Sequence, residues 1–280
     1  MKKISRRSFL AASGLTIAAL ALTACGGSAS TASSAASSVA ASSEAASTST
    51  AAAELPTVEA GKLTMATNAA FPPYEMTTDA GAFEGIDIDT AQAIADKLGL
   101  ELQIDDMDFD AALLSVQQGK ADIAMAGVTV TDERKNVMDF SDSYATGIQS
   151  IIVPEGSDIA SPDDLAGKMI GTQRGTTGYI YCSDDFGDDA VVAYDDGLTA
   201  VQALNNGQVD AVVIDNAPAK EFVAANPGLV LLDTSYAEED YAIGMAKGNT
   251  ALEDAVNAAL EELKADGTLQ SIVDKYITAE

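Results

Sequence analysis

The sequence predicts an α/β fold that is built twice, as two lobes with largely parallel sheets covered by helices on both faces. The first observation is that helical and strand-like spacings of apolar residues alternate along residues 61–276, which is typical of parallel sheets packed between helices. The second is a repeated pattern of helix, glycine, aspartate and apolar strand at residues 114–125 and 202–213. In such folds ligands bind at the carboxyl ends of the strands, so we expect one cleft between two similar lobes.

The first copy is predicted from apolar periodicity and from glycines that end its helices. Its elements are a strand at 61–67, a helix at 90–98 ended by Gly99, a strand at 100–104, a helix at 111–118 ended by Gly119, and an apolar strand at 121–126. A glycine directly after a helical pattern is a common helix end because it adopts the left-handed conformation without steric cost.

The second copy repeats the plan. Its elements are a strand at 167–172, a helix from Thr176, a short strand reached through 187–193, a helix at 198–205 ended by Asn206 and Gly207, and an apolar strand at 209–214. Residues 252–276 then have helical spacing that is broken at Asp266 and Gly267. We expect this last helix pair to pack back on the first lobe.

The N-terminal residues predict export. Residues 1–24 combine a basic head with a short apolar run, as in a signal peptide, and end at Leu22-Thr23-Ala24-Cys25, which resembles the lipobox of bacterial lipoproteins. Ser5 to Leu10 also resembles a twin-arginine signal, so both export routes remain open. Residues 25–60 are rich in Ser, Ala, Thr and Gly and predict a flexible tether behind a lipidated Cys25, with transient helix as the alternative.

Composition excludes several classes of function. A formal net charge of −28 argues against binding to nucleic acid, since no basic stripe is present. The chain has no histidine, which removes histidine-based triads and metal sites. Asp106 to Asp110 begins like a calcium loop, but Ala111 stands where the turn needs glycine. We therefore expect no cofactor and no metal, and we expect Cys182 to be buried and unpaired.

An arginine follows the strand at 121–126. Arg134 comes after Thr131, which has the position of a helix cap, and after two acidic residues. Beyond residue 24 the chain has only one other arginine, Arg174. A guanidinium can bind a carboxylate through two parallel hydrogen bonds, which a lysine cannot do. The alternative, left open by the spacing, is a surface ion pair with Asp132, Glu133 or Asp139.

An acid occupies the equivalent place in the second copy, because Asp215 follows the strand at 209–214. It could bind an ammonium group, or it could cap the helix that Pro218 is expected to begin. Together, Arg134 and Asp215 could hold the carboxylate and the ammonium of one amino acid. Phe71, on the proline-rich loop after the first strand, would place an aromatic ring at the same cleft.

The motifs resemble those of the family 3 extracellular solute-binding proteins, the polar amino-acid-binding proteins of bacterial ABC importers. They are AAFPPYE, FEGIDIDTA, an altered MDFDALL at Met107, GVTVTDERKNVMDFSDSY, DLAGKMIGTQRGTT, GQVDAVVIDNAPA and LKADGTLQSIVDKY, and they span nearly all of the body. The resemblance implies the two-lobed periplasmic-binding-protein fold of type II, with parallel-core sheets and two crossing hinge strands near 146–150 and 241–244. It places lobe 1 at 61–146 and 244–280, and lobe 2 at 147–243.

The resemblance also implies roles for individual residues. Arg134 would bind the α-carboxylate with Thr129 and with backbone N–H groups near Thr176 and Thr177, while Asp215 and the Gly127 carbonyl would bind the α-ammonium. Val128 belongs to the same segment of the cleft. Phe71 and Phe109 would enclose the ligand side chain, and Asn68 and Gln173 would line its far end. Many relatives carry an acid and a cation at these last two positions, so the two amides favour a neutral polar side chain such as that of glutamine.

The resemblance therefore implies an extracytoplasmic, lipid-anchored receptor that captures an amino acid and delivers it to an ABC permease. We expect a monomer that is not an enzyme. Two alternatives remain at this point: a cyclic-acid dehydratase on the same fold, and a ligand-sensing module that acts through a separate receptor.

Overall fold

The computed structural model describes residues 55–277, so the expected export signal, Cys25 and residues 25–54 of the expected tether lie outside the described part. The helices are α1 (Ile86–Leu98), α2 (Phe109–Gln117), α3 (Asp132–Lys135), α4 (Thr177–Phe186), α5 (Gly197–Asn205), α6 (Asn216–Ala225), α7 (Thr250–Ala265) and α8 (Thr268–Tyr276), with short 3₁₀ turns at Pro162–Leu165 and Asp188–Ala190. The strands are β1 (Lys62–Thr67), β2 (Ala70–Phe71), β3 (Glu75–Thr77), β4 (Phe83–Glu84), β5 (Glu101–Asp106), β6 (Ile123–Ala124), β7 (Met138–Phe140), β8 (Ala145–Pro154), β9 (Ile170–Gln173), β10 (Val191–Tyr194), β11 (Ala211–Asp215), β12 (Leu229–Leu231), β13 (Ala237–Tyr241) and β14 (Gly244–Ala246).

Two main sheets repeat one arrangement, which confirms the predicted α/β fold with two lobes. The first sheet has the order β5-β1-β6-β14-β7, and the second has the order β10-β9-β11-β8-β12 with β13 also on β8. In each sheet three parallel strands form the core, and the first strand of the copy lies in the middle. We call the first sheet with its helices the first lobe, and the second sheet with its helices the second lobe.

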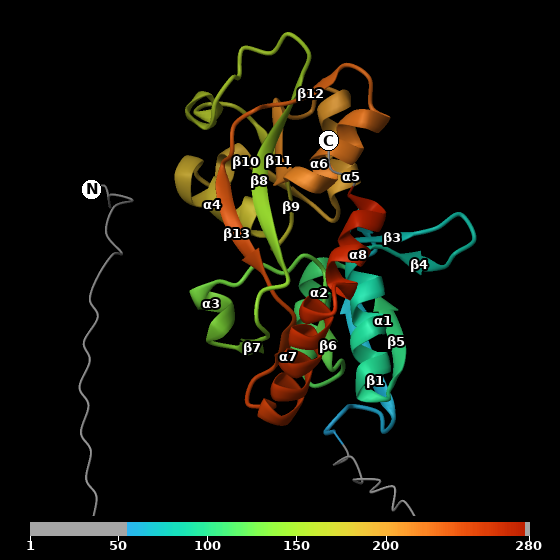
Figure 1. Cartoon of the computed structure of the whole chain (residues 1–280). Coiled ribbons are helices and arrows are strands. Elements are labelled where there is room, and N and C mark those ends of the chain that lie inside the picture. The colour runs from blue at the N-terminus through green and yellow to red at the C-terminus, as the bar shows by residue number, and fades with distance from the viewer. Residues whose placement is uncertain (1–54, 278–280) are drawn as a thin grey trace, which may run out of the picture. The chain divides into compact units, whose positions relative to one another are not determined.

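Two adjacent strands connect the lobes. β8 leaves the first lobe after β7, and β13 returns to it just before β14. The two strands are antiparallel neighbours, with Ala145 opposite Tyr241 and Gly147 opposite Glu239. Figure 1 shows them side by side between the sheet of β1 and the sheet of β9. These are the predicted crossing strands, whereas the residue boundaries of the two lobes stay a prediction.

The aspartate of the repeated pattern has the same structural role in both lobes. In the first lobe the Thr64 N–H donates to Asp122 Oδ2 at 2.7 Å, and the Asp122 N–H donates to the Thr64 carbonyl at 2.9 Å. In the second lobe the Met169 N–H donates to Asp210 Oδ2 at 2.8 Å, and the Asp210 N–H donates to the Met169 carbonyl at 2.7 Å. Each aspartate therefore joins the start of the third parallel strand to the first.

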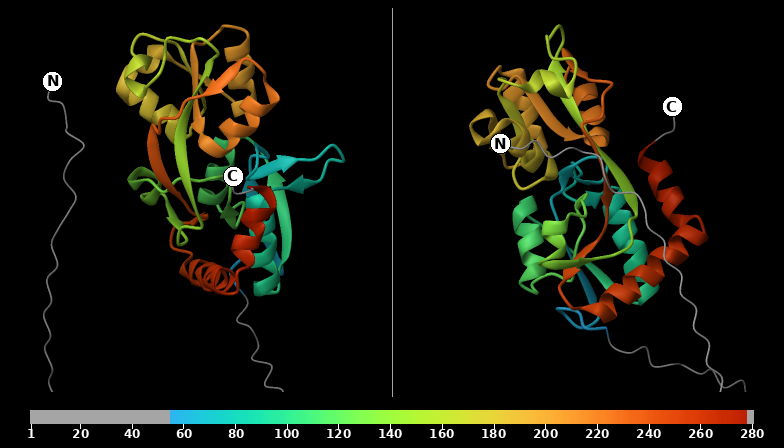
Figure 2. Two further views of the ribbon diagram at one scale, coloured as in Figure 1. Left: turned by 45° about the horizontal axis from the view of Figure 1, so that its top comes forward. Right: turned by 90° about the vertical axis from the view of Figure 1, so that its left-hand side faces the viewer.

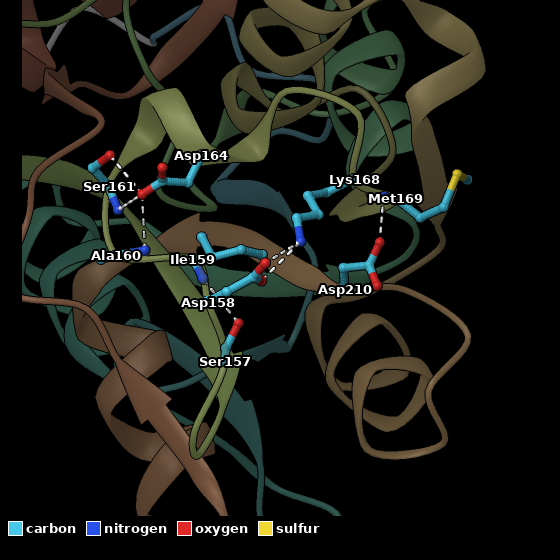
Figure 3. A network of polar contacts seen from close by, with 9 residues as sticks. All are labelled: Ser157, Asp158, Ile159, Ala160, Ser161, Asp164, Lys168, Met169 and Asp210. Atoms are coloured by element: carbon cyan, nitrogen blue, oxygen red, sulfur yellow. Dashed lines mark hydrogen bonds and ion pairs between the residues drawn. The ribbon is translucent and has the colours of Figure 1, made fainter.

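The segment that leads into β9 is fixed by further polar contacts, which Figure 3 shows. Asp164 accepts the N–H groups of Ala160 and Ser161, and Lys168 forms an ion pair of 2.8 Å with Asp158. Asp158 and Asp164 are exposed and Lys168 is partly exposed, so the ion pair contributes little to stability. Their effect is to order the loop between β8 and β9.

The C-terminal helices return to the first lobe, as the sequence predicts. Leu252, Val256 and Leu260 of α7 share one hydrophobic cluster with Ile94 of α1 and Met65 of β1. Figure 2 shows α7 and α8 beside α1. The C-terminal end of the chain is therefore packed against the first lobe, in which the described part of the chain also begins.

Several predicted boundaries are wrong by a few residues. The helix predicted at 90–98 begins earlier, at Ile86. Gly85 precedes it with a φ of 136°, a backbone angle that residues with a Cβ atom rarely adopt. The strand predicted at 121–126 pairs over Ile123–Ala124 alone. The helix expected from Pro218 already begins at Asn216. The small sheet β2-β3-β4 was not predicted, because its strands have only two or three residues.

Two further observations concern the ends of the described part. The Val58 N–H donates to Asp122 Oδ1 at 2.6 Å, so the last residues of the expected tether contact the first lobe. Within residues 55–277, every helix is too short or too polar to cross a membrane.

We predict that the two equivalent aspartates contribute unequally to stability. Asp122 is 3 % exposed, whereas Asp210 is exposed. Asp122→Ala leaves a buried N–H without its charged acceptor and should lower the free energy of unfolding by about 2 kcal/mol. Asp210→Ala should lower it by about 1 kcal/mol or less, because water can replace the carboxylate. Urea denaturation followed by circular dichroism measures both, and equal losses would contradict the shared but unequal role.

Candidate ligand-binding site

One cavity is lined by both lobes and by both crossing strands. The empty space between its lining atoms is about 410 Å³, a figure that includes space open to solvent. Its lining residues are Asn68, Phe71, Glu75, Phe109, Ala126, Gly127, Thr129, Arg134, Gln149, Gln173, Thr176, Thr177, Ile214, Asp215 and Tyr241. Most of them follow the carboxyl end of a parallel strand, where open α/β sheets bind their ligands.

The structure brings together every residue of the predicted site except Val128. The side chain of Val128 is fully buried in a hydrophobic cluster of the first lobe, with Val116 and Ala124. Its carbonyl accepts the N–H of Ala242, which follows β13. Val128 therefore holds the segment from Gly127 to Thr129 against the returning chain instead of lining the cavity.

Arg134 has a buried guanidinium group with no ionic partner. The residue is 8 % exposed, and within residues 55–277 no carboxylate oxygen lies within 4 Å of its side-chain nitrogens. Nη1 donates to the Thr129 carbonyl at 2.8 Å, and Nη2 donates to the Gly175 carbonyl of the second lobe at 3.0 Å. Burial lowers the pKa of Arg134, an effect that the charge of Glu239 opposes. Three of its five N–H groups remain for other partners.

The local sequence explains how an arginine reaches this place. Thr131 caps α3, and its Oγ1 accepts the backbone N–H of Arg134 at 3.1 Å, as the sequence predicts. Asp132 and Glu133 point to solvent, and Asp139 forms an ion pair with Lys247. The alternative of a surface ion pair for Arg134 is therefore wrong. The guanidinium instead lies 5.3 Å from the ring centroid of Phe109, as in a cation–π contact.

Asp215 lies in the part of the cavity wall that the second lobe contributes, and backbone groups hold it there. It caps α6, since Oδ1 accepts the Ala217 N–H at 3.1 Å, and Oδ2 accepts the Ile148 N–H of β8 at 2.7 Å. Burial raises the pKa of Asp215 to about 6, while its hydrogen bonds with Tyr241, Ala217 and Ile148 lower it. The sequence left open whether Asp215 caps a helix or binds an ammonium group. In the structure Asp215 caps α6 and also lines the cavity, so the two roles are compatible.

Asn68 and Gln173 meet across the two lobes. Gln173 Nε2 donates to Asn68 Oδ1 at 2.8 Å and to the Asp195 carbonyl at 3.3 Å, and Asn68 Nδ2 donates to the Met107 carbonyl at 3.0 Å. Backbone carbonyls only accept hydrogen bonds, so they fix the orientation of both amides. Gln173 Oε1 then remains as an acceptor at this end of the cavity.

Sequence reasoning missed four polar residues of the site. Gln149 and Tyr241 lie on the crossing strands and line the cavity, as does Glu75 of β3. Glu239 of β13 is 6 % exposed, and its Oε2 accepts hydrogen bonds from Thr129, Thr177 and Gln149 at 2.9 to 3.1 Å. The crossing strands were expected only as connections. In the structure Glu239 and Tyr241 are buried while Glu238 and Asp240 are exposed, but the sequence Ala237–Tyr241 has no apolar alternation that could have predicted this.

The two lobes touch where the chain enters α4. The Gly175 carbonyl accepts from Arg134, and a Cβ atom added to Gly175 would lie 1.6 Å from Oδ1 of Asp110 on α2. Thr177 Oγ1 also lies 3.4 Å from Thr129 Oγ1. These contacts join residues of opposite lobes, so the described arrangement is closed around the cavity.

Comparison with known sequences gives one family. The family model of the bacterial extracellular solute-binding proteins, family 3, matches residues 63–279. This chain is similar to a "Probable histidine-binding protein" of Neisseria gonorrhoeae, with 34 % identity over 81 % of this chain and 88 % of that protein. It is also similar to the L-cystine-binding protein of Escherichia coli, with 32 % identity over 79 % of this chain and 85 % of that protein.

Comparison with solved structures agrees. An ancestral arginine-binding protein bound to glutamine matches 78 % of this chain and 99 % of its own, with 41 % identity and a TM-score of 0.75. An ancestral arginine-binding protein bound to arginine matches with 42 % identity and a TM-score of 0.74 over 78 % of this chain and 98 % of its own.

We predict that Gly175→Ala weakens the contact between the two lobes and shifts the protein towards a more open arrangement. The added Cβ would lie 1.6 Å from Asp110 Oδ1, so this exposed side chain must turn away from the opposite lobe, while each lobe can still fold. Gly156→Ala is the matched control, because its φ of 80° resembles the 74° of Gly175 while nothing lies within 4 Å of the added Cβ. Small-angle scattering should show a larger radius of gyration for Gly175→Ala alone. Identical scattering for both variants and the unchanged protein would contradict the contact.

Proposed function

The chain belongs to the bacterial extracellular solute-binding proteins of family 3, and from this premise we propose that it captures one free amino acid between its lobes and delivers it to an ABC permease. The observation that carries the proposal is the buried guanidinium of Arg134 without an ionic partner. A buried charge is costly unless it is compensated at close range. A ligand carboxylate, bound through two parallel hydrogen bonds, is the partner whose geometry fits the remaining N–H groups.

The amino-acid backbone is proposed to lie between Arg134 and Asp215. The α-carboxylate would contact Arg134 and the N–H of Thr177 at the start of α4, where the helix end favours an anion. The α-ammonium would contact Asp215 and the Gly127 carbonyl. Asp215 has three hydrogen-bond donors and, as a carboxylate, about four acceptor positions, so it can accept one more donor.

The Thr129 hydroxyl supports this site indirectly. Its proton is directed to Glu239 in the closed arrangement, at 3.1 Å, as is that of Thr177 at 2.9 Å. A hydroxyl has one proton to donate, so these two side chains would present oxygen lone pairs to the ligand. Lone pairs suit an ammonium group. The predicted help of Thr129 in binding the carboxylate would therefore come from its main chain.

The ligand side chain is proposed to be polar and uncharged, such as that of glutamine. Phe71 and Phe109 would flank it, and it would end at the two amides Asn68 and Gln173. The groups that remain free there are the Gln173 Oε1 acceptor and one N–H of Asn68 Nδ2, so a side chain that offers both an N–H donor and a carbonyl acceptor fits best. A glutamine side chain does so, whereas a glutamate side chain would place a carboxylate against an acceptor.

Family membership sets aside the alternative of a dehydratase-like enzyme, since the family and the related proteins are solute-binding proteins. We infer from residues 1–54, which lie outside the described part, that the chain is exported and that Cys25 carries a lipid anchor at the outer face of a cell membrane. We also propose that the protein acts as a monomer. Mass spectrometry of protein extracted from membranes tests the lipid on Cys25.

We predict that Arg134→Ala abolishes amino-acid binding without unfolding the protein. Loss of a charge-assisted pair with a buried carboxylate costs about 3 to 5 kcal/mol, which lowers affinity at least about 100-fold. The melting temperature without ligand should not fall, because the substitution removes an unpaired buried charge. Arg134→Lys should also bind poorly, since an ammonium cannot form the two parallel bonds. Calorimetry measures both.

Arg174→Ala is the control for that experiment, because Arg174 is exposed and contacts the Ala193 carbonyl and Asp195 outside the proposed backbone site. It should bind the amino acid as the unchanged protein does. Equal losses of affinity in Arg174→Ala and Arg134→Ala would point to a general effect of positive charge and would contradict the proposed role of Arg134.

We predict that glutamine binds at least about 100-fold more tightly than glutamate, because burying a carboxylate against an acceptor leaves both unpaired. Gln173→Met keeps the length of the side chain and removes the acceptor, so glutamine affinity should fall about tenfold or more. Alanine is the control ligand, since it lacks the distal amide and reports only on closure. A parallel loss for alanine and glutamine, or tight binding of glutamate, would refute the proposed polarity.

A further inference from the structure

Two carboxyl groups are buried together beside the cavity. Glu75 of β3 and Asp87 of α1 are both 0 % exposed, and Glu75 lines the cavity. Among residues 55–277 neither carboxyl has a lysine or arginine nitrogen within 4 Å. A buried pair of like charges without a cation is strongly unfavourable, so one of the two groups must be neutral.

The hydrogen bonds show which group is ionised. Asp87 Oδ2 accepts the Gly127 N–H at 2.9 Å, and the Tyr144 hydroxyl donates to both Asp87 oxygens at 2.8 Å. These donors stabilise a carboxylate. In contrast, both oxygens of Glu75 are buried, and neither accepts a hydrogen bond from an N–H or O–H group in the described part of the chain, while the Glu75 carboxyl itself contacts the Asp87 carboxyl. Glu75 therefore has the environment of a protonated acid, and the nearby carboxylate of Asp87 is an acceptor for its proton.

The groups that surround the pair all favour the neutral form of Glu75. Burial raises the pKa of Glu75 well above its usual value, and the charges of Asp87 and Asp106 raise it further. Burial also raises the pKa of Asp87 to about 6, although the Gly127 N–H, Tyr144 and Glu75 lower it. Tyr74 and Tyr144, the other titratable groups that act on the pair, have a raised pKa and stay neutral.

The pair is connected to the site through Gly127. This residue has a φ of 55°, and a Cβ atom there would lie 2.9 Å from the Phe71 ring and 3.2 Å from the Tyr241 ring. The backbone of Gly127 is therefore fixed by packing at its Cα atom and by the hydrogen bond from its N–H group to Asp87 Oδ2. The Gly127 carbonyl is the group proposed above to accept the ligand ammonium.

We propose that Glu75 and Asp87 share one proton and one negative charge at neutral pH, and that this pair holds the backbone of Gly127 in position, so that its carbonyl faces the ammonium end of the cavity. Glu75 is then a positioning residue that acts as a neutral donor. The part of the proposal that concerns the ligand rests on the proposed function. The shared proton does not, and it can be tested without any ligand.

The first test counts protons in unfolding. If Glu75 is protonated when folded and ionised when unfolded, its contribution to stability is complete below pH 4.5 and is lost as the pH rises towards the folded pKa. Asp87 has a pKa of about 6 and is therefore largely ionised above pH 7, so the range from pH 7 to 8.5 isolates Glu75. There the unfolding equilibrium constant of the unchanged protein should rise tenfold per pH unit relative to Glu75→Gln.

Urea denaturation at several pH values measures that difference, and Glu84→Gln on the adjacent strand β4 is the matched control. Glu84 is exposed and lies opposite Met76, next to Glu75. Its variant should keep the pH slope of the unchanged protein. Parallel slopes for Glu75→Gln and the unchanged protein would show that Glu75 is ionised in the folded state and would overturn the proposal.

Infrared spectroscopy keeps the proposal testable if Glu75→Gln does not fold. The unchanged protein in heavy water at pH 7.5 should show the carbonyl band of a protonated carboxyl group, and Asp87→Asn should shift its titration to lower pH. Absence of that band in the unchanged protein would contradict the shared proton.

The second test measures ligand affinity with calorimetry, using glutamine as the probe. Glu75→Gln keeps a neutral donor to Asp87, so its affinity should lie within about threefold of the unchanged protein. A loss of 100-fold or more would show instead that an ionised Glu75 binds the ammonium. If no amino acid binds to the unchanged protein, the proposed function fails, while the slopes of the first test still decide the shared proton.

Discussion

The burial of one guanidinium determines how the rest of this site is arranged. Arg134 is held by the carbonyls of Thr129 and Gly175, which come from different lobes, so its position depends on closure. Two carbonyl dipoles do not compensate a full charge in a low-dielectric interior. Glu239 acts on the guanidinium from beyond ion-pair distance and leaves its free N–H groups unoccupied. The charge of Arg134 is therefore only partly compensated by the protein, and its free N–H groups can still bind a carboxylate.

The crossing strands do more than connect the lobes. β8 supplies the Ile148 N–H that fixes Asp215, and β13 supplies Glu239, which accepts hydrogen bonds from Thr129 of the first lobe and Thr177 of the second. Tyr241 lies against Gly147, where a Cβ atom would approach its ring to 2.5 Å. A change in the angle between the lobes must alter these contacts. The crossing strands thus belong to both the hinge and the ligand site. A ligand that binds the closed arrangement more tightly than the open one therefore shifts the population of the protein towards closure.

The sequence predicts the parts of the fold that depend on local pattern. The repeated helix, glycine and aspartate gave the two parallel cores, and the scarcity of arginine pointed to Arg134 before any residue was placed in space. The failures have physical reasons. Strand β6 pairs over two residues, and β2, β3 and β4 are equally short, so periodicity cannot identify them. Glu239 is separated from Thr129 by 110 residues, and Glu75 is unusual only because its burial leaves it without donors. Neither property is visible in a local pattern.

The charges near the cavity also explain why a proton on Glu75 matters. Arg134 is the cation of the lining, while Asp215, Glu239 and Asp87 are three acids within or beside it. A zwitterionic ligand adds one charge of each sign and leaves this balance unchanged. A fourth ionised acid at Glu75 would raise the pKa of Asp215 and Asp87 further, because like charges disfavour ionisation of their neighbours. Protonation of Asp215 would then weaken its interaction with the ligand ammonium. A neutral Glu75 therefore helps to keep Asp215 ionised, which the proposed binding of the ammonium requires.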